Sequence, residues 1–281
     1  MTVHGIDVSQ WQGNIDFKKV KASGVKFVIL RCNNWDNNLN CVVKDAYFES
    51  NYKKAKAAGL DVGVYYFTWQ TDTSGAKYDA DLCKKFIAGK QFEYPVYFDL
   101  EWNKAFAKGA SVCSAMVDTF CSEMEKAGYF AGLYISRSPL QQYITANVAK
   151  KYTLWIAEYA GKCNYSGSYG MWQNSSTWKV SGINGNVDHD YCYVDYPSII
   201  KNGGFNGFPK PKTETKPKVE TKVETKAETK TESKTETKKT EEKKPLSEYE
   251  RGDVNGDGKI NITDVVQLAA HVKGKRPLKK D

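Results

Sequence analysis

Short apolar runs of strand length recur along residues 1–208. They predict eight strands, at 5–9, 26–32, 61–67, 94–101, 130–136, 153–159, 170–174 and 187–193. Segments with helical periodicity lie between several of them, at 44–58, 76–88, 111–127 and 139–149. Strands that alternate with helices are typical of a parallel sheet with both faces covered. We therefore expect an α/β fold built as an incomplete TIM-like (β/α) barrel, with a doubly wound open sheet as the alternative.

The composition changes abruptly at Pro209. Residues 209–248 consist mainly of Lys, Glu and Thr in a four-residue near-repeat. Like charges recur four residues apart, for example at Glu220, Glu224 and Glu228, and they would repel one another on a helix. Because almost nothing in this segment can be buried, we expect a disordered linker. The chain then divides into a folded domain at 1–208, the linker at 209–248 and a small module at 249–281.

The formal net charge of +8 is spread over all three parts of the chain. Residues 1–208 carry 22 Lys and Arg against 19 Asp and Glu, the linker 12 against 9, and the C-terminal module 7 against 5. No part forms a basic patch interleaved with aromatic residues, so nucleic acid is not an expected partner. No apolar run approaches the roughly 18–20 residues of a membrane span, and no signal peptide is visible at the N-terminus.

The seven cysteines are widely spaced and include no Cys-x-x-Cys pair. Cys113 and Cys121 lie on one expected helix, about 12 Å apart at a rise of 1.5 Å per residue, which is too far for a disulfide. We interpret most of the cysteines as buried thiols.

Four carboxylates fall at the mouth of the expected barrel. Asp7 follows the first strand, Asp99 and Glu101 end the fourth, and Asp188 lies within the eighth. Active sites of such barrels lie at the carboxyl ends of the strands. Because side chains alternate along a strand, Asp99 and Glu101 share a face with Tyr97 and should point into the mouth. Mutual repulsion should then raise the pKa of one carboxyl group, as a general acid in glycosidic cleavage requires.

Two other interpretations of these acids remain open. Each carboxylate could be a hydrogen-bonded cap or loop residue, and together they could bind a divalent metal ion, with His189 as the nearest histidine in the sequence. Aromatic residues near the same strand ends favour a sugar substrate, since sugar rings stack on aromatic faces. The candidate substrate-binding residues are Tyr65, Tyr134, Trp155, Tyr159 and Trp172.

A set of short motifs runs through the domain in a fixed order. They are DVSQWQGNID at 7–16, GVYYF at 63–67, YFDLE at 97–101, GLY at 132–134, LWIA at 154–157, WQ at 172–173 and VD at 187–188. Over residues 3–200 the chain resembles the family-25 glycoside hydrolases, the Chalaropsis-type lysozymes or N-acetylmuramidases. The resemblance implies a flattened, incomplete β/α barrel. It also implies hydrolysis of the β-1,4 bond between N-acetylmuramic acid and N-acetylglucosamine in peptidoglycan.

The same resemblance implies a role for each carboxylate, and no cofactor for catalysis. Glu101 looks like the general acid/base, and Asp99 would orient or charge-stabilise the substrate's 2-acetamido group, while Asp7 and Asp188 would support the site. Retention through participation of the acetamido group is what the family suggests, and the residue spacing leaves a carboxylate nucleophile open. Tyr66 departs from the family's pattern, because many relatives have His there, and this departure bears on local substrate contacts.

The C-terminal module contains a loop with the spacing of a calcium site. Its ligands would be Asp253, Asn255, Asp257, the carbonyl of Lys259, Asn261 and Asp264. Together with the helix-like segment 265–274, this EF-hand-like loop resembles a dockerin repeat, which implies Ca²⁺ in the module and a cohesin on a scaffoldin as partner. Dockerins normally contain two such repeats, and this chain contains one.

The sequence therefore predicts a lysozyme tethered to a calcium-binding module, with peptidoglycan as its partner and an extracellular or cell-wall location. The alternatives are a non-catalytic cell-wall-binding protein and a scaffold-assembly protein on the same fold. The presence of all four acids favours the enzyme.

Overall fold

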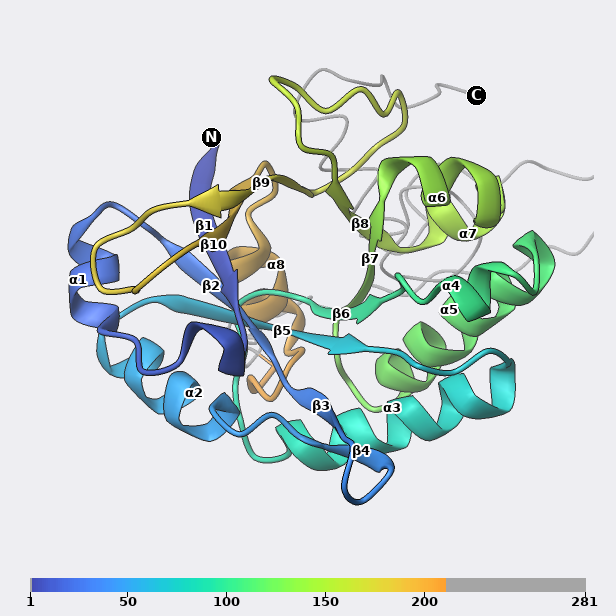
Figure 1. Ribbon diagram of the computed structural model, residues 1–281, viewed down its shortest axis with the longest axis horizontal. Helices are drawn as coiled ribbons and strands as arrows, with labels where there is room; N and C mark the ends of the chain where they lie inside the picture. The colour runs from blue at the N-terminus through green and yellow to red at the C-terminus, as the bar shows by residue number, and fades with distance from the viewer. Residues whose placement is uncertain (1, 211–281) are drawn as a thin grey trace, which may run out of the picture.

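Eight strands form the central sheet in the computed structural model, which describes residues 2–210. They are β1 (Val3–Val8), β2 (Phe27–Arg31), β5 (Asp61–Phe67), β6 (Val96–Asp99), β7 (Ala131–Ser136), β8 (Thr153–Ala157), β9 (Met171–Trp178) and β10 (Val187–Cys192). They close into a barrel in the order β1-β10-β9-β8-β7-β6-β5-β2 (Figure 1). The predicted barrel is thus confirmed, and the alternative of a doubly wound open sheet is wrong. The linker from residue 211 onward and the calcium loop at 253–264 lie outside the described residues.

The direction of β10 corrects the expectation of a parallel barrel. Seven strands run parallel, but β10 is antiparallel to both of its neighbours, β1 and β9. Its connection to β9 is the short segment 179–186. A crossover between parallel strands needs about a dozen residues or more. A connection this short therefore makes a hairpin of β9 and β10.

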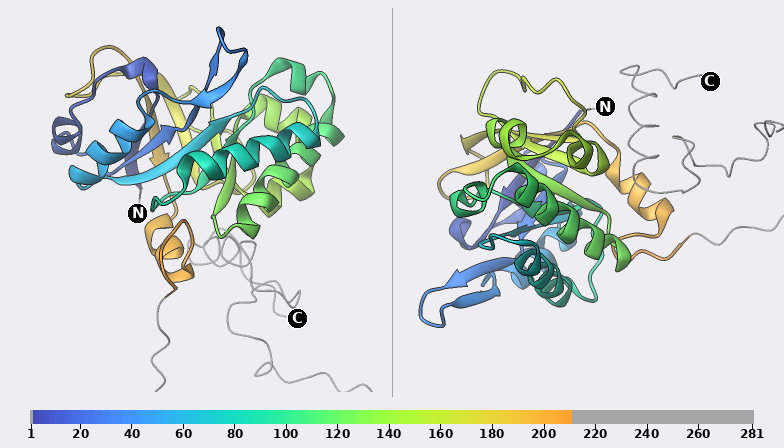
Figure 2. Two further views of the ribbon diagram at one scale, coloured as in Figure 1. Left: turned by 90° about the horizontal axis from the view of Figure 1, so that it is seen from below. Right: turned by 90° about the vertical axis from the view of Figure 1, so that its right-hand side faces the viewer.

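The helices cover only part of the barrel. The predicted helices appear as α2 (Phe48–Ala57), α3 (Thr73–Ile87), α5 (Ala110–Lys126) and the pair α6 (Arg137–Tyr143) and α7 (Ala146–Lys151). Figures 1 and 2 show α3 and α5 together on the outside of β5, β6 and β7. No helix lies between β8 and β9 or between β9 and β10. Within residues 2–210 the helix layer is therefore incomplete, as predicted.

Several elements were not predicted. They are the short helical segments η1 (Gln10–Gln12), α1 (Phe17–Ala22), α4 (Asn103–Phe106) and α8 (Tyr196–Gly203), and a two-stranded hairpin of β3 (Asn33–Asp36) and β4 (Cys41–Lys44). The hairpin projects from the body of the domain (Figures 1 and 2). Asp36 stabilises its tip, because Asp36 Oδ1 accepts hydrogen bonds from the backbone N–H groups of Asn38 and Leu39.

Aromatic side chains fill the lower part of the barrel interior. Phe27, Tyr94 and Tyr196 are buried there, and the ring of Phe27 stacks on that of Tyr94 with 4.3 Å between centroids. Gly5 faces this ring on the neighbouring strand, and a Cβ atom at Gly5 would lie 2.2 Å from Phe27. Glycine is therefore needed at this position, since any side chain would displace the packed floor.

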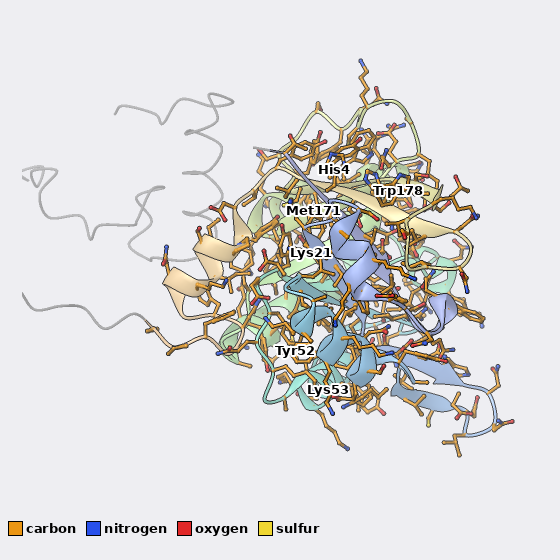
Figure 3. The ribbon with its side chains drawn as sticks, turned by 90° about the vertical axis from the view of Figure 1, so that its left-hand side faces the viewer. His4, Lys21, Tyr52, Lys53, Met171 and Trp178 are labelled. Atoms are coloured by element: carbon orange, nitrogen blue, oxygen red, sulfur yellow. The ribbon has the colours of Figure 1, made fainter. Side chains whose placement is uncertain are left out.

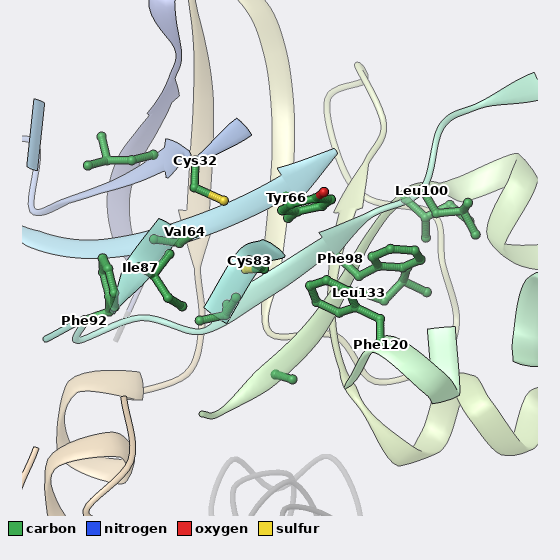
Figure 4. Close-up of a cluster of buried hydrophobic side chains, with 14 of the residues drawn as sticks. Cys32, Val64, Tyr66, Cys83, Ile87, Phe92, Phe98, Leu100, Phe120 and Leu133 are labelled. Carbon is green, nitrogen blue, oxygen red and sulfur yellow. The ribbon is translucent and has the colours of Figure 1, made fainter. Parts of the chain in front are cut away.

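A second apolar layer lies between the sheet and the helices. Figure 4 shows Tyr66, Phe98 and Leu133 of the strands against Phe120 of α5. The rings of Phe98 and Phe120 stack with 4.5 Å between centroids. Phe98 faces outward, whereas its neighbours Tyr97 and Asp99 face the barrel interior. The alternation predicted for this strand is thus confirmed.

The cysteines form no disulfide, and five of the seven are buried. The interpretation of most of them as buried thiols is confirmed. None of the helices within residues 2–210 combines the length and the apolar character that crossing a bilayer requires.

Tyr66 lies beneath α3 and away from the barrel mouth. Its hydroxyl donates to Asp79 Oδ1 at 2.9 Å, and Thr68 Oγ1 donates to Asp79 Oδ2 at 2.6 Å. Asp79 is fully buried, and the loss of hydration raises the pKa of its carboxyl group to about 7. The departure at Tyr66 therefore concerns the support of β5 rather than a substrate contact.

Asp79 should make stability depend on pH. Its pKa is higher in the folded protein than the ordinary 3.8, so its stabilising contribution is complete below that value and is lost as the pH rises through about 7. Asp79→Asn should reduce the difference in Tm between pH 5 and pH 8 by at least about 2–4 °C, the shift that about 1 kcal/mol produces in a chain of this size. Asp81→Asn, on the exposed side of the same helix, is the control. An unchanged difference in Asp79→Asn would contradict this account.

Candidate active site

The four predicted carboxylates meet in one pocket at the carboxyl ends of the parallel strands. The pocket has a volume of about 120 Å³. It is lined by Asp7, Arg31, Tyr65, Phe67, Asp99, Glu101, Tyr134, Trp155, Gln173 and Asp188. The aromatic floor of the barrel lies below it, and the ring of Trp155 packs on that of Tyr97 with 5.2 Å between centroids. The carboxylates therefore stand on an apolar base that excludes water from one side.

The antiparallel direction of β10 brings Asp188 into this pocket. Asp188 is the second residue of β10, and it pairs with Asp7 in the register of β1 and β10. The beginning of an antiparallel strand lies at the same edge of the sheet as the ends of its parallel neighbours. Asp188 therefore reaches the mouth from the opposite chain direction, although it stands at the start of its strand.

Gln173 of β9 connects several pocket residues. Its Nε2 donates to Asp7 Oδ2 at 2.8 Å, and its Oε1 accepts from the hydroxyls of Tyr134 at 2.8 Å and Tyr159 at 3.0 Å. Burial raises the pKa of Asp7 well above its ordinary value, and the nearby charges of Asp188 and Asp190 raise it further. Gln173 therefore fixes Asp7 while opposing only part of this rise.

Asp99 and Glu101 occupy different environments although they are two residues apart. Asp99 is 3% exposed, and burial and the charge of Glu101 raise its pKa well above the ordinary value. Its Oδ1 atom has no hydrogen-bond partner. Glu101 lies beyond the end of β6 with an exposed side chain. Partial loss of hydration and the charge of Asp188 nevertheless raise its pKa. The pair thus combines a buried acceptor with an accessible acid.

Arg31 is the one cation among the residues that line the pocket. Its guanidinium carbon lies 5.0 Å from the ring centroid of Phe67 and 5.5 Å from that of Trp69. The positive charge lowers the pKa of Asp99 and of Glu101, which opposes the effect of burial. One cation does not balance the surrounding acids, so the site favours protonated carboxyl groups.

Asp190 is a fifth carboxyl group at the site, which was not predicted. It is completely buried, and Trp155 Nε1 donates to its Oδ1 at 2.8 Å, whereas its Oδ2 has no partner. Burial raises its pKa well above the ordinary value, and the charge of Asp188 adds to the rise. Strand alternation from Asp188 places Asp190 on the same inner face. That signal was present in the sequence. Arg31 and Gln173 were also not predicted, although Arg31 lies near the end of an expected strand and Gln173 belongs to the WQ motif at 172–173.

The predicted substrate-binding aromatics occupy three kinds of position. Tyr65, Tyr134 and Trp155 line the pocket. Tyr159 lies at its rim, 59% exposed and bonded to Gln173. Trp172 lies on the outer side of β9, where its ring stacks on Tyr191 of β10. The prediction for Trp172 is therefore not supported, because Gln173 takes the inward position on this strand.

His189 does not accompany the acids. It faces outward from β10, where its Nε2 lies 3.1 Å from His4 Nδ1 and its Nδ1 lies 2.7 Å from Asn174 Oδ1. Figure 3 shows His4 on this side of the barrel, near Trp178. Across residues 2–210, no three His, Cys, Asp or Glu side chains form a group arranged to hold a metal ion. The pocket instead has the residues of a carboxylate acid–base site.

Comparison with known proteins identifies relatives over about two thirds of the chain. The autolytic lysozyme of Clostridium acetobutylicum is 28% identical over 187 residues, which are 66% of this chain and 54% of that protein. Lysozyme M1 of Streptomyces globisporus is 27% identical over 208 residues, which cover 67% of each chain. The chain thus spans about half the length of the first of these relatives.

Solved structures share the same fold. The modular autolysin LytC of Streptococcus pneumoniae, solved in complex with a synthetic peptidoglycan ligand, has a TM-score of 0.61 at 26% identity over 68% of this chain and 47% of that chain. The bacterial lysozyme of Streptomyces coelicolor has a TM-score of 0.59 at 21% identity over 72% of this chain and 98% of that chain. The profile of glycosyl hydrolases family 25 matches residues 6–183, including Asp7, Asp99 and Glu101. Because this match covers more than half of the chain, the protein belongs to glycosyl hydrolases family 25.

Proposed function

We propose that this protein is a lysozyme that hydrolyses the β-1,4 bond between N-acetylmuramic acid and N-acetylglucosamine in bacterial peptidoglycan. The observation that carries the proposal is the meeting of Asp7, Asp99, Glu101 and Asp188 in one pocket with aromatic walls. The lysozymes among the relatives and the peptidoglycan ligand of LytC support the substrate class. The site of action would be the cell wall.

Glu101 is the proposed general acid and base. It lies on the open side of the pocket, and burial and the charge of Asp188 raise its pKa. A carboxyl group with a raised pKa keeps its proton under mildly acidic conditions and can donate it to the departing sugar oxygen. The resulting carboxylate can then take a proton from the water that attacks the sugar. Carboxyl groups alone supply this chemistry, so no cofactor takes part.

Asp99 is the proposed partner of the substrate's 2-acetamido group. Its Oδ1 is buried and lacks a hydrogen-bond donor in the free protein. The N–H of an acetamido group would supply that donor and remove the cost of an unsatisfied buried acceptor. In this arrangement the acetamido oxygen can attack the anomeric carbon; direct attack by Asp99 is the competing route.

The remaining acids are proposed to support Glu101 and Asp99. The charge of Asp188 raises the pKa of Glu101. Asp7 lies near Asp188 and is fixed by the hydrogen bond from Gln173. The hydrogen bond from Trp155 holds Asp190 below them. The members of this group that are ionised would stabilise the positive charge that develops on the sugar ring during cleavage.

For residues 249–281 we propose a calcium-dependent docking module. The ligand spacing at Asp253, Asn255 and Asp257 supports calcium binding. Through this module the chain would bind a cohesin on a scaffoldin protein. This proposal rests on the sequence alone, and its failure would leave the proposal for the barrel unaffected.

Glu101→Gln should abolish hydrolysis while leaving the fold intact, because the amide cannot donate the required proton. The rate at which reducing ends are released from purified peptidoglycan should fall by at least about 100-fold. Glu123→Gln, which changes a carboxyl group outside the pocket on α5, should retain the native rate. Full activity of a correctly folded Glu101→Gln protein would refute the assignment.

The pH dependence of kcat/KM should shift in opposite directions in two variants. Activity should fall at alkaline pH as Glu101 loses its proton. Asp188→Asn removes a charge that raises the pKa of Glu101, so the alkaline limb should move to lower pH. Arg31→Gln removes a charge that lowers this pKa, so the limb should move to higher pH. Shifts in the same direction, or none, would exclude Glu101 as the titrating acid.

Calcium binding should be measurable by calorimetric titration of the full chain. We expect one Ca²⁺ per chain, and no binding by Asp257→Ala, which lacks a central ligand of the loop. Asp72→Ala, in the barrel, should bind like the native chain. The absence of a binding signal from the native chain would refute the calcium site.

A further inference from the structure

A second and larger cavity lies beside the pocket of acids. It has a volume of about 760 Å³, within the range of roughly 300–1,000 Å³ that is usual for ligand sites. Four tryptophans line it, namely Trp11, Trp35, Trp69 and Trp102. We call this cavity the tryptophan groove. The pocket of acids, at about 120 Å³, is too small to hold more than the reacting part of a ligand.

The tryptophan groove continues the pocket of acids. Phe67 lines the pocket, and Trp69, two residues further along the chain, lines the groove. In the same way, Glu101 lines the pocket, and the next residue, Trp102, lines the groove. The guanidinium of Arg31 lies over the rings of both Phe67 and Trp69 and so stands between the two cavities. A polymer bound at Glu101 would therefore extend into the groove.

The walls of the groove are held in place before any ligand binds. Asn33, at the start of β3, exchanges two hydrogen bonds with the backbone of Phe67, at 2.8 Å and 3.0 Å. Asp45, directly after β4, accepts from the backbone N–H of Gln10 at 2.9 Å. These contacts fix the β3–β4 hairpin against β5 and against η1, which carries Trp11. A site formed in advance in this way loses less entropy on binding.

The chemistry of the lining fits the rings and the N-acetyl groups of a sugar chain. Trp11 is 76% exposed, and the rings of Trp35 and Trp69 lie 5.8 Å apart at an angle of 52°. Such faces suit the apolar faces of sugar rings, and Gln10, Asn34, Asn37 and Gln70 offer amide groups for hydroxyl and acetamido substituents. Among the described residues that line the groove, Lys104 is the one with a charge. An anionic peptide would find a single matching charge there.

We propose that the tryptophan groove binds N-acetylated sugar units of the same glycan strand beyond the cleaved bond, so that cleavage becomes faster on longer strands. This inference rests on the proposed function, since it takes the occupant to be the continuation of the substrate. Trp11 and Trp35 are the residues that determine this preference. They act on binding of the strand and leave the proton transfer at Glu101 unchanged.

The test compares two variants on peptide-free glycan strands of different length. Trp11→Ala and Trp35→Phe should each lower kcat/KM on long strands, Trp11→Ala by at least about tenfold through KM. Both should cleave the shortest hydrolysed oligosaccharide at the native rate. The control is Trp178→Ala. Trp178 of β9 packs its ring on that of His189 of β10 and lines neither cavity. Because Trp11 is exposed, its removal does not threaten the fold.

Two outcomes would overturn the inference. One is an undiminished preference for long strands in Trp11→Ala. The other is a loss confined to strands that carry stem peptides, which would make the groove a peptide site. Binding of a β-1,4-linked N-acetylglucosamine hexamer to the Glu101→Gln protein, followed by tryptophan fluorescence, tests the groove separately. If the native chain does not hydrolyse peptidoglycan, the proposed function is refuted. If the hexamer nevertheless binds and its binding depends on Trp11, the groove is still a sugar-binding site.

Discussion

The gathering of five carboxyl groups around one arginine is the constraint on which the active site depends. Burial of ionised carboxylates is costly, so these groups have raised pKa values and keep their protons to higher pH than exposed carboxyl groups do. Closure of the sheet by β10 keeps Asp188 and Asp190 against Asp7, and the donors of Gln173 and Trp155 fix two of the carboxyl groups. The aromatic floor beneath these carboxyl groups keeps out water that could otherwise solvate their charges. The same arrangement gives Glu101, at the open edge, the raised pKa that an acid catalyst needs.

Features that follow from local alternation could be predicted from the sequence. The strand that ends in Asp99 has an apolar outer face and a polar inner face, so the inward direction of Tyr97 and Asp99 was readable. The convergence of acids from three strands followed from the rule that barrel sites lie at strand ends. The motifs around these residues also indicated the family, which the comparisons confirmed. Long helices such as α3 and α5 were predicted for the same reason, because their apolar periodicity is strong.

Features that depend on contacts distant in the chain could not be predicted. An apolar run does not specify the direction of its strand, so the antiparallel course of β10 had to come from the structure. The hairpin that carries Trp35 lies in an asparagine-rich segment with few apolar residues, and its position depends on Asn33 and Asp45 bonding to other elements. Trp172 was assigned to the site although the next residue, Gln173, faces inward. Pattern alone identifies two faces of a strand without saying which one is inside.

The central claim is that the pocket cleaves the glycan of peptidoglycan at muramic acid. The most direct measurement is the identity of the sugar at each new reducing end after digestion of purified peptidoglycan by the full chain. Borohydride reduction followed by acid hydrolysis converts that sugar alone to its alcohol. The account predicts muramicitol as the product. Glucosaminitol, or no new reducing end, would contradict it.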